Sequence, residues 1–192
     1  MRYSKDHKAE TRRKILNAAA RLFREFGYDG VGVDAIMNEV GLTAGGFYAH
    51  FDSKETLFAE AMGTALDESN LLLAAKRPGI TGMDALRNVV YSYLSRTHRD
   101  MVSAGCPLPA VTPDVARSSD ATRECYEQRL RHYLSEIEGL LPEGASPARD
   151  RALALVAQCV GGLMLSRAVK DENFSNQILK ACRQAAMKIG EQ

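Results

Sequence analysis

Basic residues near the start of the chain are the first candidates for chemistry, because lysine and arginine side chains bind phosphate. Residues 1–24 hold eight of them against two acids, a net charge of +6, whereas the whole 192-residue chain has a net charge of only +1. Charge divided in this way indicates that one end of the molecule meets phosphate and the other does not. A solvated basic helix face would show the same run. The cations are Arg2, Lys5, Lys8, Arg12, Arg13, Lys14, Arg21 and Arg24.

The four cysteines are the second candidates. Their spacing is unpaired, which argues against a disulfide framework and a zinc site, so we expect no metal and no cofactor. Cys106 lies in a Gly-Cys-Pro break, where it is either a small buried hydrophobe or a reactive thiol that senses oxidants or electrophiles. It follows a predicted helix C-terminus, which disfavours a thiolate, although Arg99 and His98 could offset this. The sequence has no nucleophile elbow and no glycine-rich loop after a strand, so an enzyme is not expected.

Residues 33–57 could hold DNA-binding side chains in place, because they predict a helix-turn-helix. Apolar residues recur at i, i+3, i+4 and i+7 from Val33 onward, which puts them on one face of a short helix. Gly41 then allows a left-handed helix end, and the side chain of Thr43 can cap a second short helix. Two short helices joined by a turn that contains glycine form a helix-turn-helix.

The segment GLTAGGFYAHFDSKETLF, residues 41–58, makes this outline specific. It resembles the DNA-binding domain of the TetR/AcrR family of bacterial repressors, whose pattern of Tyr, Phe and Ser-Lys-Glu it matches in spacing and identity. The resemblance covers roughly residues 8–60, and beyond them only length and helix layout agree. It implies a homodimer that binds a double-stranded, pseudo-palindromic operator and is released by an unknown small molecule. The matching residues are Tyr48, Phe51, Ser53, Lys54 and Glu55.

The same resemblance assigns DNA contacts to individual residues. Tyr48 and Lys54 are expected to contact phosphates, as are Thr43 and His50, which positions a protein on DNA without reading sequence. Arg12, from the basic run, is expected on the same surface.

The predicted recognition helix departs from the family pattern at its start. Ala44, Gly45 and Gly46 stand where the family often has a long polar residue and a Thr or Ser, so the backbone and its free N–H groups can approach the duplex closely. Ala44 can contact a thymine methyl group, while DNA shape or the N-terminal arm would supply further specificity. In the alternative interpretation, the glycines only relieve crowding against the first helix.

The fold is predicted to be all-α, with about nine helices in two domains. Residues 1–52 form the three-helix DNA-binding domain, with a mobile arm at residues 1–8, and residues 53–192 form a helical effector-binding and dimerisation domain. One continuous helix would join them, so that movement at its far end displaces the recognition helix. Besides the two short helices, the predicted helices span about 9–26, 53–75, 83–104, 113–117, 120–140, 148–170 and 174–190.

The last two predicted helices are the candidates for dimerisation. Residues 152–165, ALALVAQCVGGLML, are apolar all round apart from Gln158, so the helix needs cover on every side. We expect half of a four-helix bundle formed with a second copy of the chain, as in the family. In the alternative, both helices pack only within the monomer. The predicted interface residues are Ala154, Ala157, Gly161, Ile178, Cys182, Ala185 and Ile189.

A small-molecule pocket is expected among the C-terminal helices, lined by apolar residues with a few polar handles. The function expected is that of an effector-released repressor, and the alternative is a repressor switched by covalent modification of Cys106. The start of the chain has no apolar signal region and no run is long enough for a membrane helix, so a cytoplasmic protein without membrane contact is expected. The predicted pocket residues are Tyr91, Tyr93, His98, Met101, Cys106, Tyr126, Gln158 and Cys159.

Overall fold

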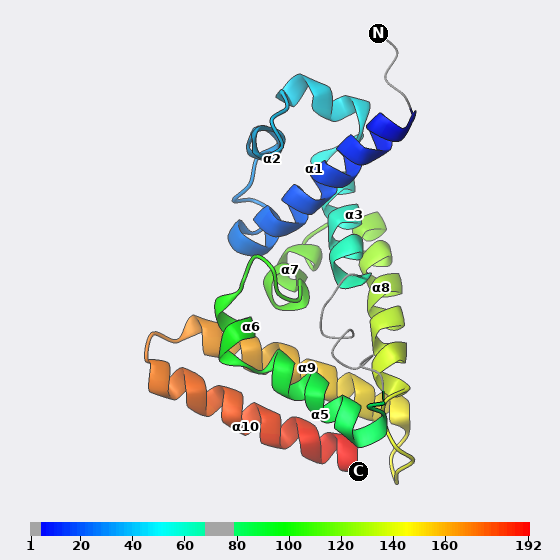
Figure 1. The fold of residues 1–192 in the computed structure, drawn as a ribbon, viewed down its shortest axis with the longest axis vertical. Coiled ribbons are helices and arrows are strands. Elements are labelled where there is room, and N and C mark those ends of the chain that lie inside the picture. The colour runs from blue at the N-terminus through cyan, green and yellow to red at the C-terminus, as the bar shows by residue number, and fades with distance from the viewer. Residues whose placement is uncertain (1–4, 68–78) are drawn as a thin grey trace.

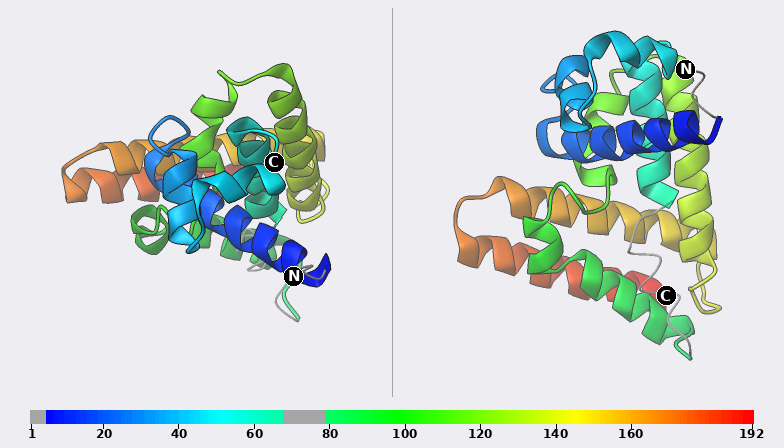
Figure 2. Two further views of the ribbon diagram at one scale, coloured as in Figure 1. Left: turned by 90° about the horizontal axis from the view of Figure 1, so that it is seen from above. Right: turned by 45° about the horizontal axis from the view of Figure 1, so that its top comes forward.

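The computed structural model describes residues 5–67 and 79–192, and every regular element among them is helical. Figure 1 shows the N-terminal helices at one end of an elongated molecule and α5, α9 and α10 at the other, with α3 and α8 side by side between them. The right view of Figure 2 shows the same two ends. The elements are α1 (Lys5–Phe26), α2 (Val33–Glu39), η1 (Ala44–Ala49), α3 (Lys54–Asp67), α5 (Gly82–Tyr93), α6 (Arg96–Asp100), α7 (Leu108–Val115), α8 (Asp120–Glu138), α9 (Ala148–Ala168) and α10 (Glu172–Glu191).

Two predicted helix starts are wrong. The helix α1 already begins at Lys5, so the predicted mobile arm is wrong for residues 5–8, while residues 1–4 lie outside the described residues. The helix α7 begins at Leu108 rather than near residue 113. The end predicted for the helix over residues 53–75 also lies outside the described residues. The helices predicted over 120–140, 148–170 and 174–190 are confirmed as α8, α9 and α10.

The single helix predicted over residues 83–104 is two helices, α5 and α6, separated at Leu94 and Ser95. The hydroxyl of Ser95 accepts a hydrogen bond from the His98 N–H at 3.1 Å and donates to the Ser92 carbonyl at 2.8 Å. This serine therefore caps α6 and ends the path of α5. The apolar period continues through the break, which is why periodicity alone joined the two helices.

Two hydrophobic cores hold the molecule together. The N-terminal core is built from α1, α2, η1 and α3, and it also takes Val111 and Val115 from α7. The C-terminal core is built mainly from α5, α8, α9 and α10. Tyr126 of α8 packs against both cores, so the two ends of the molecule share α7 and α8.

A glycine with positive φ ends each of the helices α1 and α2. Gly41 has φ +71°, its N–H donates to the Asn38 carbonyl at 3.0 Å, and the Leu42 N–H donates to the Met37 carbonyl at 2.9 Å. This is the Schellman arrangement, which needs a left-handed residue and so favours glycine. Gly27, with φ +73°, ends α1 through a bond to the Phe23 carbonyl at 3.0 Å.

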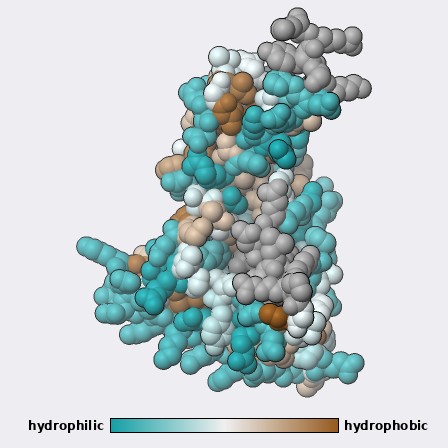
Figure 3. All heavy atoms as spheres, viewed as in Figure 1, coloured by the Kyte–Doolittle hydropathy of each residue, from teal (hydrophilic) through white to brown (hydrophobic). Residues whose placement is uncertain are grey.

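No helix within residues 5–67 and 79–192 combines the length and apolarity that crossing a membrane requires. On the face seen in Figure 3, the side chains over the C-terminal helices are mainly hydrophilic, and hydrophobic residues form small separate spots.

Candidate nucleic-acid interface

The predicted second helix of the helix-turn-helix is present as η1, but it is a six-residue 3-10 helix rather than an α-helix of two turns. Its aromatic residues divide between inside and outside. Phe47 and Phe51 are buried with stacked rings 5.8 Å apart, which seats η1 on the N-terminal core. Tyr48 is 72% exposed and lies edge-on to Phe47 at 5.2 Å. The hydroxyl of Tyr48 is therefore presented to solvent from a rigid base.

The caps around η1 differ from the prediction. Thr43 stands at the N-cap of η1, but its side chain makes no capping bond, and only its carbonyl accepts the Gly46 N–H at 3.0 Å. The exposed hydroxyl of Thr43 is thus not used by the helix. The cap after η1 is Ser53, whose Oγ accepts the Thr56 N–H at 3.0 Å and so starts α3.

Arg12 lies behind η1 and is bound on three sides. Its Nη2 is 2.5 Å from Oε2 of Glu60, its Nε donates to the His50 carbonyl at 3.4 Å, and its guanidinium stands 4.4 Å from the centre of the Phe51 ring. The carbonyl of His50 closes η1, so Arg12 fixes the end of η1 against α1 and α3. Its charge has a carboxylate partner, so Arg12 holds η1 in position, and its contact with DNA stays a prediction.

Other basic residues of α1 also bind partners within the protein. Arg21 pairs with Glu39 of α2, and Nε of Arg24 donates to the Ser103 carbonyl at 2.8 Å. Lys14 pairs with Glu10 one turn earlier at 3.0 Å. The net charge of +6 on residues 1–24 is therefore partly neutralised by acids outside this segment, which counting charges along the sequence could not show.

Lys54 and His50 stand at the two ends of the turn between η1 and α3. Nζ of Lys54 lies 4.1 Å from the centre of the Tyr28 ring, a cation–π contact that orients the ammonium group. Nδ1 of His50 is buried and has no hydrogen-bond partner among the described residues. Burial, with the charges of Lys8 and Arg12, lowers the pKa of His50, so the imidazole is neutral in the free protein at pH 7.

Titration of His50 should couple DNA affinity to pH. A phosphate beside the ring would favour the imidazolium and raise its pKa, so that binding takes up a proton and affinity rises as pH falls through the pKa of the complex. We expect duplex binding, measured by fluorescence anisotropy at constant ionic strength, to be stronger at pH 6 than at pH 8. His50→Gln should flatten that part of the profile. An unchanged slope in His50→Gln would remove His50 from the contact surface.

The two glycines of η1 do not relieve crowding against α1, and that alternative is wrong. A Cβ atom at Gly45 would meet nothing within 4 Å, and one at Gly46 would lie 3.7 Å from the Met37 methyl group of α2, an ordinary contact. Neither glycine has a positive φ. Packing within the chain therefore gives no reason for glycine at Gly45.

The N-terminal domain is tied to the following helices through carboxylates that accept main-chain N–H groups. Oε1 of Glu55 accepts the Ser119 N–H at 2.9 Å and the Thr122 hydroxyl at 3.0 Å, which lowers the pKa of Glu55. Oδ2 of Asp114 accepts the Tyr28 N–H at 2.9 Å. Sequence reasoning placed Glu55 in the first turn of its helix but missed this link, because its partners lie more than sixty positions away.

The predicted pocket residues differ in their burial. Tyr93, His98, Cys106 and Cys159 are buried in the C-terminal domain. The exposed fractions of Tyr91 and Met101 are 49% and 50%, and Met101 follows α6, beyond the break after α5. Their place in the lining of a pocket stays a prediction. Gln158 is half-buried.

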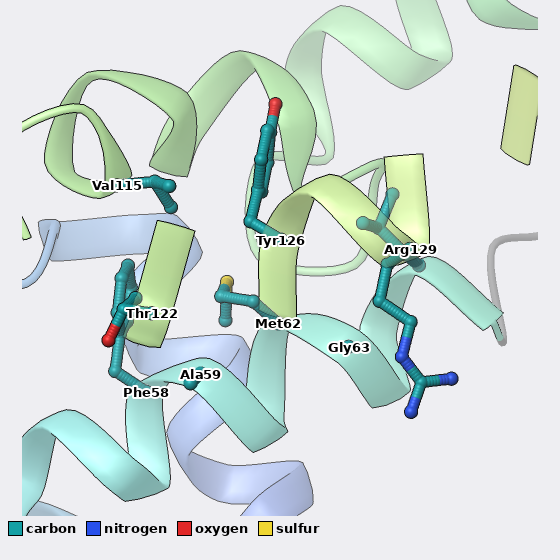
Figure 4. Close-up of a pocket in the computed structure, with 9 residues that line it drawn as sticks. Phe58, Ala59, Met62, Gly63, Val115, Thr122, Tyr126 and Arg129 are labelled. Carbon is teal, nitrogen blue, oxygen red and sulfur yellow. The ribbon is translucent and has the colours of Figure 1, made fainter. Parts of the chain in front are cut away.

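Two hollows flank Tyr126, which is the only one of the eight predicted pocket residues that lines them. The inner one is a cavity of about 10 Å³ between α3 and α8, lined by Met62, Tyr126 and the other residues shown in Figure 4. The outer one is an open groove of about 480 Å³ along α7 and α8. The Tyr126 hydroxyl lies 2.7 Å from the Thr112 hydroxyl of α7, so this side chain separates the cavity from the groove.

Cys106 is enclosed by a hydrogen-bonded clasp. Its N–H donates to Nε2 of His98 at 2.9 Å, and Nδ1 of His98 lies 2.7 Å from the Tyr93 carbonyl, so both ring nitrogens of a neutral imidazole are satisfied. The thiol is 2% exposed, and burial raises its pKa to about 11. A protonated, buried thiol is a poor nucleophile, and the structure does not favour the thiol-switch alternative.

Alkylation should measure this protection. The pKa of Cys106 is raised from 9.0 to about 11, which lowers its thiolate fraction at pH 7 about a hundredfold, and burial adds a steric barrier. We expect N-ethylmaleimide to label Cys106 at least a hundredfold more slowly in the native protein than in urea, as followed by mass spectrometry. Cys106→Ser identifies the peptide. Native labelling as fast as in urea would contradict the burial.

The predicted dimerisation residues lie at the opposite end of the molecule from η1. On α9, Ala154 and Ala157 are exposed and a Cβ at Gly161 would meet nothing within 4 Å. Three larger apolar residues extend this face. They are Leu153, Met164 and Leu165, which are 45%, 37% and 60% exposed.

On α10, the predicted residues Ile178, Cys182, Ala185 and Ile189 are half-buried. Cys182 and Ile189 pack against the C-terminal core of their own chain. Sequence reasoning missed Phe174, which is 52% exposed near the start of α10. The available signal was that Phe174 precedes the regularly spaced apolar residues of the helix, so it does not belong to its buried face.

A helix-turn-helix on a rigid three-helix base, joined to a larger helical domain, defines a DNA-binding transcriptional regulator. Residues 15–61 match the family model for bacterial regulatory proteins, tetR family. The N-terminal domain of the chain is therefore that of a TetR-family transcriptional regulator.

Relatives agree along most of the chain. The chain is 29% identical over 170 residues to the HTH-type transcriptional regulator LmrA of Bacillus subtilis, covering 84% of this chain and 89% of that protein. It is 35% identical over 80 residues to the HTH-type transcriptional repressor Rv1474c of Mycobacterium tuberculosis, covering 42% of each. The crystal structure of a TetR-family regulator from Cytophaga hutchinsonii superposes with a TM-score of 0.78 at 19% identity, covering 98% of each chain.

Proposed function

We propose that this regulator is a dimeric repressor that binds a pseudo-palindromic operator and is released by a small molecule held among its C-terminal helices. The observation that carries the proposal is the placement of two unpartnered surfaces. The outward face of η1, with Tyr48 exposed, lies at one end of the molecule, and the apolar face of α9 lies at the other. Repression is supported by the relative Rv1474c, whose name describes a repressor.

The apolar face of α9 supports a two-fold dimer, because exposed aliphatic side chains beside an open Gly161 allow close packing of a second α9. In such a dimer two copies of η1 enter successive major grooves, with half-sites about one helical turn apart or slightly more. Thr43, Tyr48, His50 and Lys54 would contact phosphates on either side of η1. Residues 1–52 would then be the DNA-binding domain and residues 53–192 the effector and dimerisation domain.

Release by an effector requires that a change in the C-terminal domain reaches η1. The helices α7 and α8, which the two ends of the molecule share, could transmit it. Tyr126 lies between the inner cavity and the outer groove and packs against both cores. A ligand that displaced Tyr126 would shift α7, whose Asp114 holds the start of the turn after α1. To move most molecules out of the DNA-binding state, the ligand must favour the other state by roughly 5 kcal/mol.

Binding to duplexes tests the proposal. Fluorescence anisotropy should show that the protein prefers the DNA upstream of its own gene over random duplex of the same length, with an affinity that falls steeply with salt. Sedimentation should show a dimer at the same concentration. A monomer with no salt-sensitive preference for that DNA would contradict the proposal.

A further inference from the structure

Lys54 differs from the other basic residues near η1 in the kind of partner it has. Arg12, Lys14 and Arg21 each pair with a glutamate. Among residues 5–67 and 79–192, Lys54 has no carboxylate partner, and its Nζ lies 4.1 Å from the centre of the Tyr28 ring. The face of an aromatic ring attracts an ammonium group without neutralising its charge. The charge of Lys54 therefore stays available to a phosphate.

The ring of Tyr28 is itself held firmly. Its centre lies 5.0 Å from that of Phe58, in an edge-on contact, and 6.0 Å from that of Phe23, in a stacked contact. Phe23 and Phe58 are completely buried in the N-terminal core, whereas Tyr28 is half-buried at its margin. A lysine side chain that rests on a fixed ring has less conformational freedom to lose on binding than one that moves freely in solvent.

The main chain of Tyr28 is held from the other side by α7, which lies beside α1 (Figure 1). Oδ2 of Asp114 accepts the Tyr28 N–H at 2.9 Å, and a Cβ at Gly27 would lie only 3.3 Å from the same oxygen. The other oxygen of this carboxylate, Oδ1, lies 2.6 Å from Nη2 of Arg117. An unbroken series of contacts thus runs from α7 through Tyr28 to Lys54.

We propose that Tyr28 is a positioning residue for the DNA contact of Lys54. Its ring holds the ammonium group in place, and Asp114 of α7 fixes the turn that carries the ring. This inference rests on the proposed function, because it requires Lys54 to contact a phosphate of the duplex. It adds that the position of this contact is set from α7, so that a displacement of α7 displaces the ammonium group with it.

Changes to the ring at position 28 test the contact while keeping the packing. Tyr28→Phe should bind the DNA upstream of the gene within about twofold of the wild type, because both rings attract cations. Phenylalanines that carry one, two and three ring fluorines nearly keep the shape of the ring but attract a cation progressively less. Across this fluorinated series the dissociation constant, measured by anisotropy at constant salt, should rise stepwise by about two- to tenfold in total, the cost of ordering one long side chain on binding. Tyr28→Leu, which has no ring, should lose at least as much.

A double-mutant cycle with Lys54→Met separates positioning from packing. Lys54→Met should itself bind DNA more weakly, and the fluorinated series should cause no further loss in this background, because no ammonium group remains to be positioned. The temperature of thermal unfolding should be the same throughout the series. A loss that came from packing alone would be equal with and without the Lys54 ammonium group.

The link to α7 is tested at its carboxylate. Asp114→Ala removes the acceptor of the Tyr28 N–H, and we expect it to weaken DNA binding about two- to tenfold in the wild type but not in Lys54→Met. The matched control is Arg117→Ala, which removes the other partner of Asp114 and leaves the bond to Tyr28 intact. Arg117→Ala should bind DNA as the wild type does.

Each outcome has a distinct meaning. If the fluorinated series binds as tightly as the wild type, or more tightly, the role of Tyr28 is overturned while the proposed function stands. If Asp114→Ala loses the same affinity in both backgrounds, the link from α7 is overturned. If the wild type shows no preference for the DNA upstream of its gene, the proposed function fails and this inference fails with it. If Tyr28→Leu does not fold, the fluorinated series alone decides.

Discussion

Gly161→Arg should turn the protein into a folded monomer that binds its operator roughly a thousandfold more weakly. A Cβ at Gly161 meets nothing within 4 Å in the protomer, so an arginine can extend into solvent without disturbing α9. In the proposed dimer the same position faces a second α9, where an unpaired charge cannot be buried cheaply. Losing the second half-site then removes an avidity of about 10²–10⁴. Sedimentation and anisotropy measure the two effects.

The control for this experiment is Gln128→Arg, which adds the same charge to an exposed position of α8. It should remain dimeric and bind DNA as the wild type does. Circular dichroism should show unchanged helix content for both variants. A dimeric Gly161→Arg protein with full operator affinity would place the dimer interface elsewhere.

Gly162→Val should instead destabilise the fold, although it is the next residue along. A Cβ at Gly162 would lie 2.6 Å from Sγ of Cys182, 2.7 Å from its Cβ and 3.2 Å from a methyl group of Leu94. The added side chain must push α9 away from α10, and overpacking of this kind costs about 3 kcal/mol. Urea unfolding should show the loss in the free energy of unfolding.

Gly139→Ala serves as the comparison for Gly162→Val, because a Cβ there makes only ordinary contacts at 3.7 Å. Its free energy of unfolding should change by no more than about 1 kcal/mol. Equal stability of Gly162→Val and the wild type would mean that α9 and α10 are less closely packed than the structure has them.

The sequence predicted the helix-turn-helix well because its signals are local. The apolar period of α2, the left-handed Gly41 and the Ser53 cap each act within a few residues. The 3-10 form of η1 was not predictable in the same way, because it depends on how Phe47 and Phe51 seat on the core of other helices. The same limit applied to Arg24, whose partner carbonyl lies seventy-nine positions along the chain.

The pocket was harder to predict for a different physical reason. An apolar period places residues on the inner face of a helix, but it does not distinguish the lining of a cavity from filled core. Tyr93 and Cys159 share that face with true core residues and are themselves core. Tyr91 and Met101 are about half exposed, and a capping serine between them breaks the helix on which both were placed.

The insertion of Val111 and Val115 into the N-terminal core has a consequence for signalling. Since α7 supplies part of the hydrophobic interior on which η1 rests, a shift of α7 must carry the three-helix head with it as one block. On effector binding, the N-terminal helices would then rotate as a rigid body. The distance between the two copies of η1 would change, while every helix stays intact. The helix content measured by spectroscopy should therefore not change at effector concentrations that abolish operator binding.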